Sequence, residues 1–217
     1  MSDFSARRRN MVDTQIRPSD VTKFPVISAM LSVAREAFVP RAKREAAYVG
    51  DTMDLGAGRI LLDARVFAKM LDAVNVQPNE MVLHIGAGMG YGPAVLAQLA
   101  EAVVAVEEDE TLASEAQTAL SDQNADAVAL HTGPLADGAA AFGPYDVMIL
   151  EGGVEVMPDA LIAQIKEGGR ICAIFMHGAL GVVRIGYKLD GAMVWRDVFN
   201  AAAPVLPGFA AVPEFAL

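Results

Sequence analysis

Cysteine is nearly absent from this 217-residue chain, in which Cys172 is the only one. A lone cysteine excludes an intramolecular disulfide and fits a reducing compartment such as the cytoplasm. It lies in the apolar run Ile171 to Phe175, which predicts a buried and unreactive thiol. Histidine is also rare, and His131 and His177 lie too far from any carboxylate cluster to predict a metal site.

Positive charge is scarce as well. Lys and Arg number 17 against 27 Asp and Glu, so the formal net charge is -10. An acidic surface of this kind repels phosphate backbones, and nucleic acid is therefore not an expected partner. Arg7 to Arg9 form the one basic cluster, which we interpret as a solvated face of an N-terminal helix.

Long hydrophobic runs are missing too. The most apolar stretch, Ile171 to Tyr187, carries His177, Arg184 and three glycines, so it predicts strand, turn and strand and no membrane partner. The N-terminus becomes basic and polar after Phe4, without the apolar segment of a secretory signal. Hydrophobic residues make up 53% and charged residues 20% of the chain, which is typical of a globular domain.

The chain changes pattern near Asn79. Before it, apolar residues at helical spacing predict helices over Val26–Ala37 and Val66–Val74, separated by a glycine-containing loop at Asp51–Arg59. We expect one domain of residues 1–217, in which residues 1–79 form a helical N-terminal cap and residues 80–217 a ligand-binding sheet with a C-terminal hairpin.

From Met81 onward, short apolar runs alternate with helical stretches. This alternation predicts a mostly parallel sheet with helices on both faces. Asp190-Gly191, between the last two runs, predicts a hairpin turn. The predicted strands are Met81–Ile85, Ala102–Val106, Ala127–His131, Asp146–Leu150, Arg170–Phe175, Val182–Leu189 and Met193–Phe199, and the predicted helices are Tyr91–Leu99, Glu110–Leu120 and Asp159–Lys166.

A glycine-rich turn follows the first of these strands, with Gly86, Gly88 and Gly90 at alternate positions. Glycine permits a tight turn and lets a ligand approach the backbone. The turn lies at the carboxyl end of a central strand, where open α/β sheets bind ligands. Tyr91 stands where a dinucleotide fingerprint requires glycine, so the pattern disfavours a dinucleotide.

An acidic residue, Glu107, ends the second strand. It lies roughly 20 residues beyond the turn, where a carboxylate accepts both ribose hydroxyls of an adenosyl ligand. The alternative is that Glu107 to Glu110 form a solvated, acidic helix start. Because position and residue type agree, we expect Glu107 to bind a ribose, with Glu108 beside it.

These residues and several further segments resemble the protein-L-isoaspartate O-methyltransferase family. Val82 to Ala97 is similar to the family's nucleotide motif, V-L-E-I-G-x-G-x-G-Y-x-x-A-V-L-A, and Val33 to Pro40 is similar to its V-P-R-E-x-F-V-P. Ala47-Tyr48, Pro144 to Asp146 and Leu161 to Arg170 match further family segments. The resemblance covers most of residues 10–175.

The resemblance implies the α/β fold of class I methyltransferases. This is a Rossmann-like, doubly wound, mostly parallel seven-stranded sheet with a reversed last strand and an N-terminal helical cap. It also implies S-adenosylmethionine as the cofactor, and methyl transfer to a carboxylate of a damaged, isoaspartyl protein or peptide. The residues it assigns to the cofactor are His84, Gly86, Ala87, Gly88, Gly90, Tyr91, Glu107, Glu108, Leu135 and Glu151.

The chain departs from the family pattern in its substrate loop. The family's G-x-T-x-S-x-P corresponds to Gly58–Ala64, with Ile60 at the threonine position and Leu62 at the serine position. Neither of these side chains forms hydrogen bonds. Arg59 is then a candidate catalytic residue that pairs a substrate carboxylate, and the alternative is a surface arginine.

Further departures concern the cofactor. The family's aspartate after the third strand is missing from Gly133 to Leu135, and His84 replaces the acid of the first motif. A neutral His84 accepts a hydrogen bond from the cofactor, or it is simply a packed residue. Glu151 follows the fourth strand and either binds the cofactor's amino group, acts as a base on the substrate, or faces water.

Three functions remain open from the sequence. The first is isoaspartyl methyl transfer, the second is methyl transfer to another acceptor such as a small molecule, and the third is cofactor binding without turnover. The apolar tail from Ala201 to Leu217 packs either on its own core or on a partner, and the oligomeric state is left open.

Overall fold

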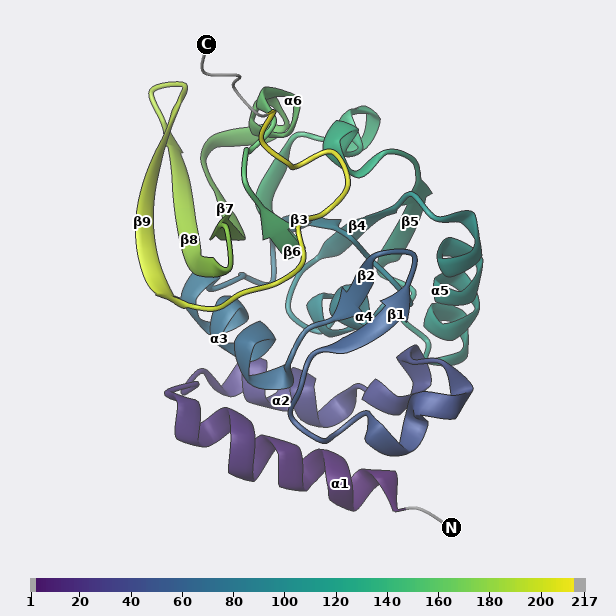
Figure 1. Ribbon diagram of the computed structural model, residues 1–217. Helices are drawn as coiled ribbons and strands as arrows, with labels where there is room; N and C mark the ends of the chain where they lie inside the picture. The colour runs from purple at the N-terminus through teal and green to yellow at the C-terminus, as the bar shows by residue number, and fades with distance from the viewer. Residues whose placement is uncertain (1–2, 213–217) are drawn as a thin grey trace.

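A seven-stranded sheet forms the centre of the protein, with strand order β5-β4-β3-β6-β7-β8-β9 (Figure 1). The structure is a computed structural model that describes residues 3–212. Strands β3 to β7 pair in parallel, and β8 is antiparallel to both of its neighbours. The strands are β3 (Met81–Ile85), β4 (Ala102–Glu107), β5 (Val128–Thr132), β6 (Tyr145–Val154), β7 (Ile165–His177), β8 (Leu180–Leu189) and β9 (Ala192–Asn200).

The predicted hairpin joins β8 to β9. Asp190 and Gly191 have φ of 51° and 78°, the conformation of a tight turn that suits a twisted ribbon. The reversed strand is therefore β8. The expectation of a reversed last strand is wrong in this detail, because the hairpin turns the chain once more and β9 runs in the common direction again at the edge of the sheet.

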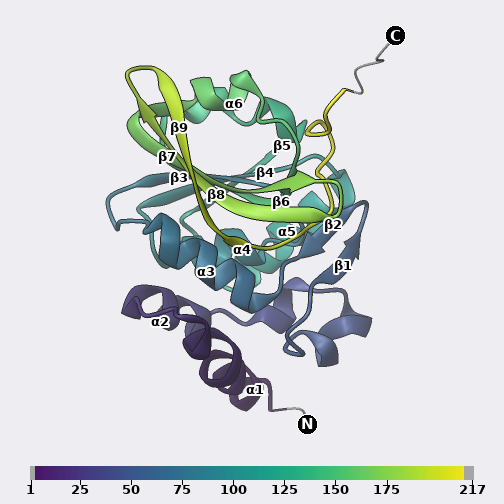
Figure 2. The same cartoon turned by 60° about the vertical axis from the view of Figure 1, so that its left-hand side comes forward.

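Helices cover both faces of the sheet (Figure 2). Helices α3 (Ala64–Val74), α4 (Tyr91–Leu96) and α5 (Glu110–Asp122) lie on one side, and α6 (Asp159–Ala163) lies on the other. Strand residues alternate between two buried clusters, as a period of two requires. By the same alternation, His84, Glu107 and Glu151 all point to the face that α3 and α4 cover.

The N-terminal residues form an outer layer beneath α3 and α4 (Figure 2). Its helices are α1 (Phe4–Met11) and α2 (Phe24–Ser32). The helix predicted over Val26–Ala37 ends earlier than expected, because Val33 is extended and a separate 3-10 turn follows at Arg35–Phe38.

The predicted loop at Asp51–Arg59 contains a hairpin instead. Strands β1 (Met53–Gly56) and β2 (Arg59–Leu61) pair antiparallel as a separate two-stranded sheet. Ala57 and Gly58 both have positive φ, 51° and 71°, and form its tip. Such short strands carry little sequence signal, which is why the pattern predicts only a loop.

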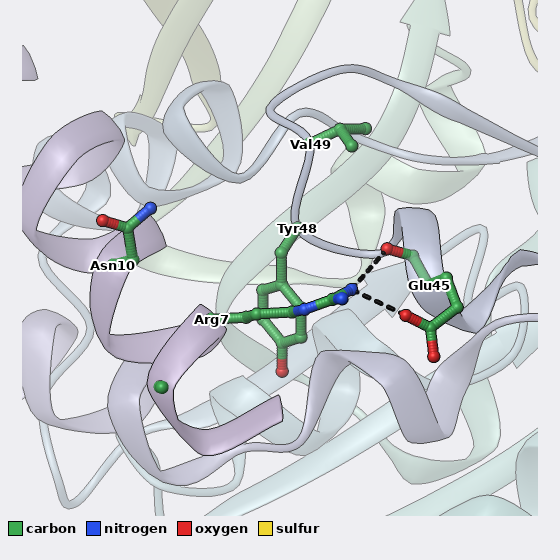
Figure 3. Close-up of a pocket in the computed structure, with 6 residues that line it drawn as sticks. Arg7, Asn10, Glu45, Tyr48 and Val49 are labelled. Atoms are coloured by element: carbon green, nitrogen blue, oxygen red, sulfur yellow. Dashed lines mark hydrogen bonds and ion pairs between the residues drawn. The ribbon is translucent and has the colours of Figure 1, made fainter. Parts of the chain in front are cut away.

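In the basic run of α1, Arg7 and Arg9 are exposed, as predicted, and Arg8 is half-buried. Arg7 reaches the carbonyl and the carboxylate of Glu45, each at 2.9 Å, across a pocket that Tyr48 and Val49 also line (Figure 3). Arg8 donates to the Tyr48 hydroxyl and pairs with Glu36. These contacts tie α1 to the following turns of the outer layer.

The C-terminal segment packs on the protein's own core as far as it is described. Leu206 and Phe209 are buried, and Gly153 of β6 exchanges hydrogen bonds with Pro204 and Leu206. The remaining part of the predicted tail, residues 213–217, lies outside the described residues.

Cys172 is fully buried in the core, as predicted, and burial raises the pKa of its thiol to about 12. No helix within residues 3–212 is both long and apolar enough to cross a membrane. Those same residues contain no cluster of histidine, cysteine and carboxylate side chains with the arrangement of a metal site.

Candidate functional site

The glycine-rich turn links β3 to α4. Gly86, Gly88 and Gly90 all have positive φ, at 82°, 53° and 96°, and the values at Gly86 and Gly90 strongly favour glycine. The N–H groups of Gly86 and Ala87 donate to the Val106 carbonyl of β4. The turn is entirely buried, because side chains from two other segments pack on it: Leu55 of β1 near Gly88 and Leu206 of the tail near Gly86.

Glu107 ends β4 beside this turn, and it is buried, not solvated. Its Oε2 accepts from the Gly88 N–H at 2.8 Å. Its Oε1 accepts from the N–H groups of Glu108 at 2.9 Å and Asp109 at 3.1 Å. Backbone donors therefore fix the position of the carboxylate. The rest of the acidic run differs, since Asp109 caps α5 and Glu110 is exposed.

Arg59 lies directly on Glu107. Its Nε is 3.0 Å from Glu107 Oε1 and 3.2 Å from Oε2, and its Nη2 is 3.1 Å from Glu108 Oε1. The Arg59 side chain is only 1% exposed, so it is not the surface arginine of the alternative interpretation. Its predicted role with a substrate carboxylate stays a prediction, and in this structure its partners are the two carboxylates of the predicted ribose site.

His84 and Glu151 form a second buried pair, from β3 and β6. His84 Nε2 is 3.2 Å from Glu151 Oε2, and the side chains are 0% and 3% exposed. Glu151 Oε1 accepts from the Leu62 N–H at 3.3 Å. Glu151 therefore lies against the loop that corresponds to the family's substrate loop, and does not face water.

The first turn of α4 leaves no spare room for this pair. A Cβ at Gly92 would lie 2.4 Å from Glu151 Oε2 and 2.6 Å from His84 Nε2. We expect Gly92→Ala to lower the free energy of unfolding by about 1–3 kcal/mol, because the pair must separate or shift. Chemical denaturation measures this loss. A variant that gained stability, as helix propensity alone predicts, would contradict the placement of the pair.

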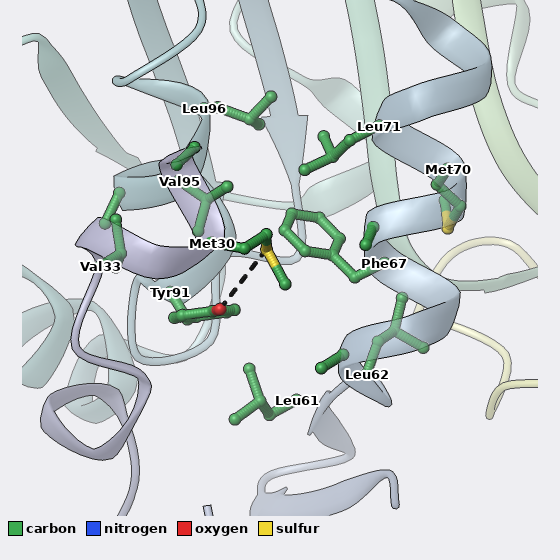
Figure 4. Packing of buried hydrophobic residues seen from close by; sticks show 14 of the residues in the cluster. Met30, Val33, Leu61, Leu62, Phe67, Met70, Leu71, Tyr91, Val95 and Leu96 are labelled. Atoms are coloured by element: carbon green, nitrogen blue, oxygen red, sulfur yellow. Dashed lines mark hydrogen bonds between the residues drawn. The ribbon is translucent and has the colours of Figure 1, made fainter. Parts of the chain in front are cut away.

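The loop that holds Leu62 is packed into the core (Figure 4). Leu61 and Leu62 are 2% and 1% exposed and belong to the same cluster as Phe67 and Tyr91. Tyr91 donates its hydroxyl to the Met30 sulfur at 3.6 Å, so it faces the helical layer. Burial raises the pKa of Tyr91 against the lowering effect of a nearby arginine, and the ring stays a neutral phenol.

That arginine is Arg35, which no sequence pattern marks as a site residue. It is 2% exposed, donates from Nη2 to the Leu62 carbonyl at 2.6 Å and from Nε to the Ala47 carbonyl at 2.8 Å, and lies over the Tyr91 ring. Arg35 thus binds the carbonyl of Leu62, and Glu151 binds its N–H. The only sequence signal for Arg35 was its place within the segment Val33–Pro40.

A cavity of about 480 Å³ opens at the carboxyl ends of β4 and β5. Its lining includes Arg59, Glu108, Thr132 and Gly133. Leu135 is buried, and its N–H donates to Oε2 of Glu108, one of the lining residues, at 3.4 Å. The structure thus brings Gly88, Glu107, Glu108 and Leu135 together, whereas His84 and Glu151 meet at the Leu62 side.

Comparison with known proteins agrees with this arrangement. The sequence profile described as "Protein-L-isoaspartate(D-aspartate) O-methyltransferase" matches residues 6–196. A protein-L-isoaspartate O-methyltransferase of Opitutus terrae is 34% identical over 164 residues, which cover 76% of this chain and 70% of that protein. One of Rhodopseudomonas palustris is 36% identical over 161 residues, with 74% of each chain covered.

Solved structures show the same fold. A structure named protein-L-isoaspartate O-methyltransferase matches with a TM-score of 0.81 at 22% identity, over 93% of this chain and 66% of that chain. A second, from Plasmodium falciparum and described as a putative enzyme of this name in complex with S-adenosyl-L-homocysteine, matches with a TM-score of 0.79 at 15% identity over 95% and 99%. The predicted fold class is confirmed, and the chain belongs to the protein-L-isoaspartate O-methyltransferase family.

Proposed function

We propose that this chain is a cytoplasmic, S-adenosylmethionine-dependent O-methyltransferase that esterifies a carboxylate of an isoaspartyl protein or peptide. Family membership supports the reaction class. The observation that carries the proposal is Glu107, a buried carboxylate that backbone N–H groups fix beside the glycine turn. An acceptor placed at the end of β4 suits the two hydroxyl donors of a ribose.

The surrounding residues fit an adenosyl group in part. The glycine backbone permits close approach, and the cavity at the ends of β4 and β5 offers space for a base next to Glu107. Leu55 and Leu206 now fill the space on the glycine turn itself, and Arg59 lies on Glu107 beside it. An adenosyl group therefore fits if these side chains move, and Arg59 must leave Glu107.

Methyl transfer to a carboxylate requires little of the protein beyond positioning the two reactants. When bound, S-adenosylmethionine supplies a methyl group on a cationic sulfur, and S-adenosylhomocysteine is released once a carboxylate oxygen has taken that methyl. A carboxylate acceptor is already ionised at neutral pH and needs no general base. The residues of this chain accordingly bind the two reactants, orient them and exclude water from the site.

We also propose that residues 1–79 act as a cap that completes the site within a single domain. Both buried arginines come from this part of the chain. Arg35 holds the Leu62 carbonyl, and Arg59 holds Glu107. Without these residues the carboxyl ends of β3, β4 and β6 would be open to solvent.

A second candidate function is methyl transfer to a different acceptor, such as a small molecule. The buried Ile60, Leu61 and Leu62 favour it, because they offer no side-chain hydrogen bonds to a peptide. Their packing into the core leaves recognition of an acceptor to other residues.

Incubation with methyl-labelled S-adenosylmethionine separates these candidates. We expect base-labile methyl ester on a peptide that contains isoaspartate and none on the same peptide with ordinary aspartate. Ester formation on neither peptide, with cofactor binding intact by calorimetry, would favour the second candidate. Failure to bind the cofactor at millimolar concentration would overturn the proposal.

A further inference from the structure

Glu107 has no acceptor capacity left for a ligand while Arg59 is in place. Its Oε2 accepts from the Gly88 N–H, and its Oε1 accepts from the N–H groups of Glu108 and Asp109. Arg59 Nε approaches both oxygens, at 3.0 and 3.2 Å, so a ribose hydroxyl on either oxygen competes with the guanidinium.

We propose that Arg59 is a latch on the ribose site, which holds Glu107 in the ligand-free chain and exchanges with an adenosyl ligand for that carboxylate. This inference rests on the proposed function, because it takes the adenosyl group as the competing ligand. It assigns Arg59 a role that differs from pairing a substrate carboxylate.

The position of Arg59 supports such an exchange. The side chain lines the cavity at the ends of β4 and β5, and its other side touches Glu107, which in turn binds Gly88 of the glycine turn. The guanidinium therefore separates an open cavity from the buried turn. Its removal would expose Glu107 to that cavity.

The hairpin that carries Arg59 is exposed at its tip, whereas β2 itself is buried. Strands β1 and β2 pair only with each other, and a two-stranded ribbon is marginally stable by itself. The tip at residues 56–58 is exposed, and a Cβ at Gly56 or Gly58 would meet nothing within 4 Å. Leu55 and Arg59, on either side of the tip, are its contacts with Gly88 and Glu107.

The latch is not bound as strongly as its burial suggests. Within the described residues, Arg59 Nη1 is buried without a hydrogen-bond partner. An unpaired donor on a buried cation is unfavourable, which offsets part of the attraction to Glu107. Glu107, in contrast, keeps its backbone donors when Arg59 leaves. The backbone donors therefore keep the Glu107 carboxylate in place while a ligand replaces Arg59.

Calorimetric titration with S-adenosylhomocysteine tests the latch on three forms of the full chain. We expect Arg59→Met to bind at least tenfold more tightly than the wild type, because the ligand no longer displaces a guanidinium. Arg65→Met is the matched control, since Arg65, in the first turn of α3, is 55% exposed and pairs with Asp63. Its affinity should equal that of the wild type.

Equal or weaker binding by Arg59→Met than by the wild type would overturn the latch and leave the proposed function standing. Absence of binding in all forms would overturn both. Thermal unfolding of each variant checks that it is folded, and Arg59→Gln, which keeps a polar side chain of similar shape, replaces Arg59→Met if that variant is not. Tighter binding by Arg59→Gln supports the latch in the same way.

Discussion

Replacing Glu107 with Gln is expected to lower the free energy of unfolding by about 3–5 kcal/mol. The change removes the negative charge next to Arg59, and both side chains are at most 1% exposed. It also places an amide NH2 against the backbone donors of Gly88 or of Glu108 and Asp109, so that donor meets donor. Urea denaturation at neutral pH measures the loss.

Glu108→Gln is the matched control for this prediction. Glu108 also pairs with Arg59, at 3.1 Å, but its side chain is 31% exposed. Water screens such a pair, so we expect a loss of at most about 1 kcal/mol. A Glu107→Gln variant that was as stable as Glu108→Gln would show that Glu107 is not the buried centre of this network.

The same Glu107→Gln variant should lose cofactor binding. An amide accepts at one atom only, and the ribose hydroxyls need an acceptor for each donor. Glu107→Gln is therefore expected to lower both stability and ligand affinity. The latch variant Arg59→Met removes the other partner of the same ion pair and is expected to raise ligand affinity. No purely structural role of the ion pair predicts these opposite changes.

A Leu62→Ser variant is expected to lose about 4 kcal/mol of unfolding free energy. Leu62 is 1% exposed within the apolar cluster around Phe67 (Figure 4). Truncating a buried leucine costs about 2–5 kcal/mol, and a hydroxyl without a partner adds to this. The matched control is Leu180→Ser at a position that is 77% exposed, where a change within about 0.5 kcal/mol is expected.

This substitution restores the residue type of the family's substrate loop, so it also has a functional readout. We expect no gain in methyl ester formation, because Arg35 and Glu151 hold the Leu62 backbone inside the core. A variant that kept its stability and gained activity on an isoaspartyl peptide would show that the loop faces the substrate, contrary to its packing here.

The fold was largely predictable from the sequence, because hydrophobic periodicity is a local signal. The alternation after Met81 gave the sheet and its closing hairpin. Short elements with weak periodicity were not predictable, which explains the β1–β2 hairpin and the early end of the helix at Ser32.

The candidate site was predictable only where its residues belong to one short, continuous unit of the sequence. The turn at Gly86 and the acid at Glu107 are joined by one strand–helix–strand unit, so their spacing is informative. The Arg59–Glu107 pair joins residues 48 positions apart, and no spacing rule predicts such a contact. Arg35 was missed because a buried arginine has the same sequence appearance as an exposed one.

A crystal structure of the chain with S-adenosylhomocysteine is the most direct test of the ribose site. We expect both ribose hydroxyls on Glu107, the base in the cavity beside Glu108, and the Arg59 guanidinium withdrawn from the carboxylate. A bound ligand with Arg59 still in contact with Glu107, or with its ribose held by other residues, would contradict this assignment.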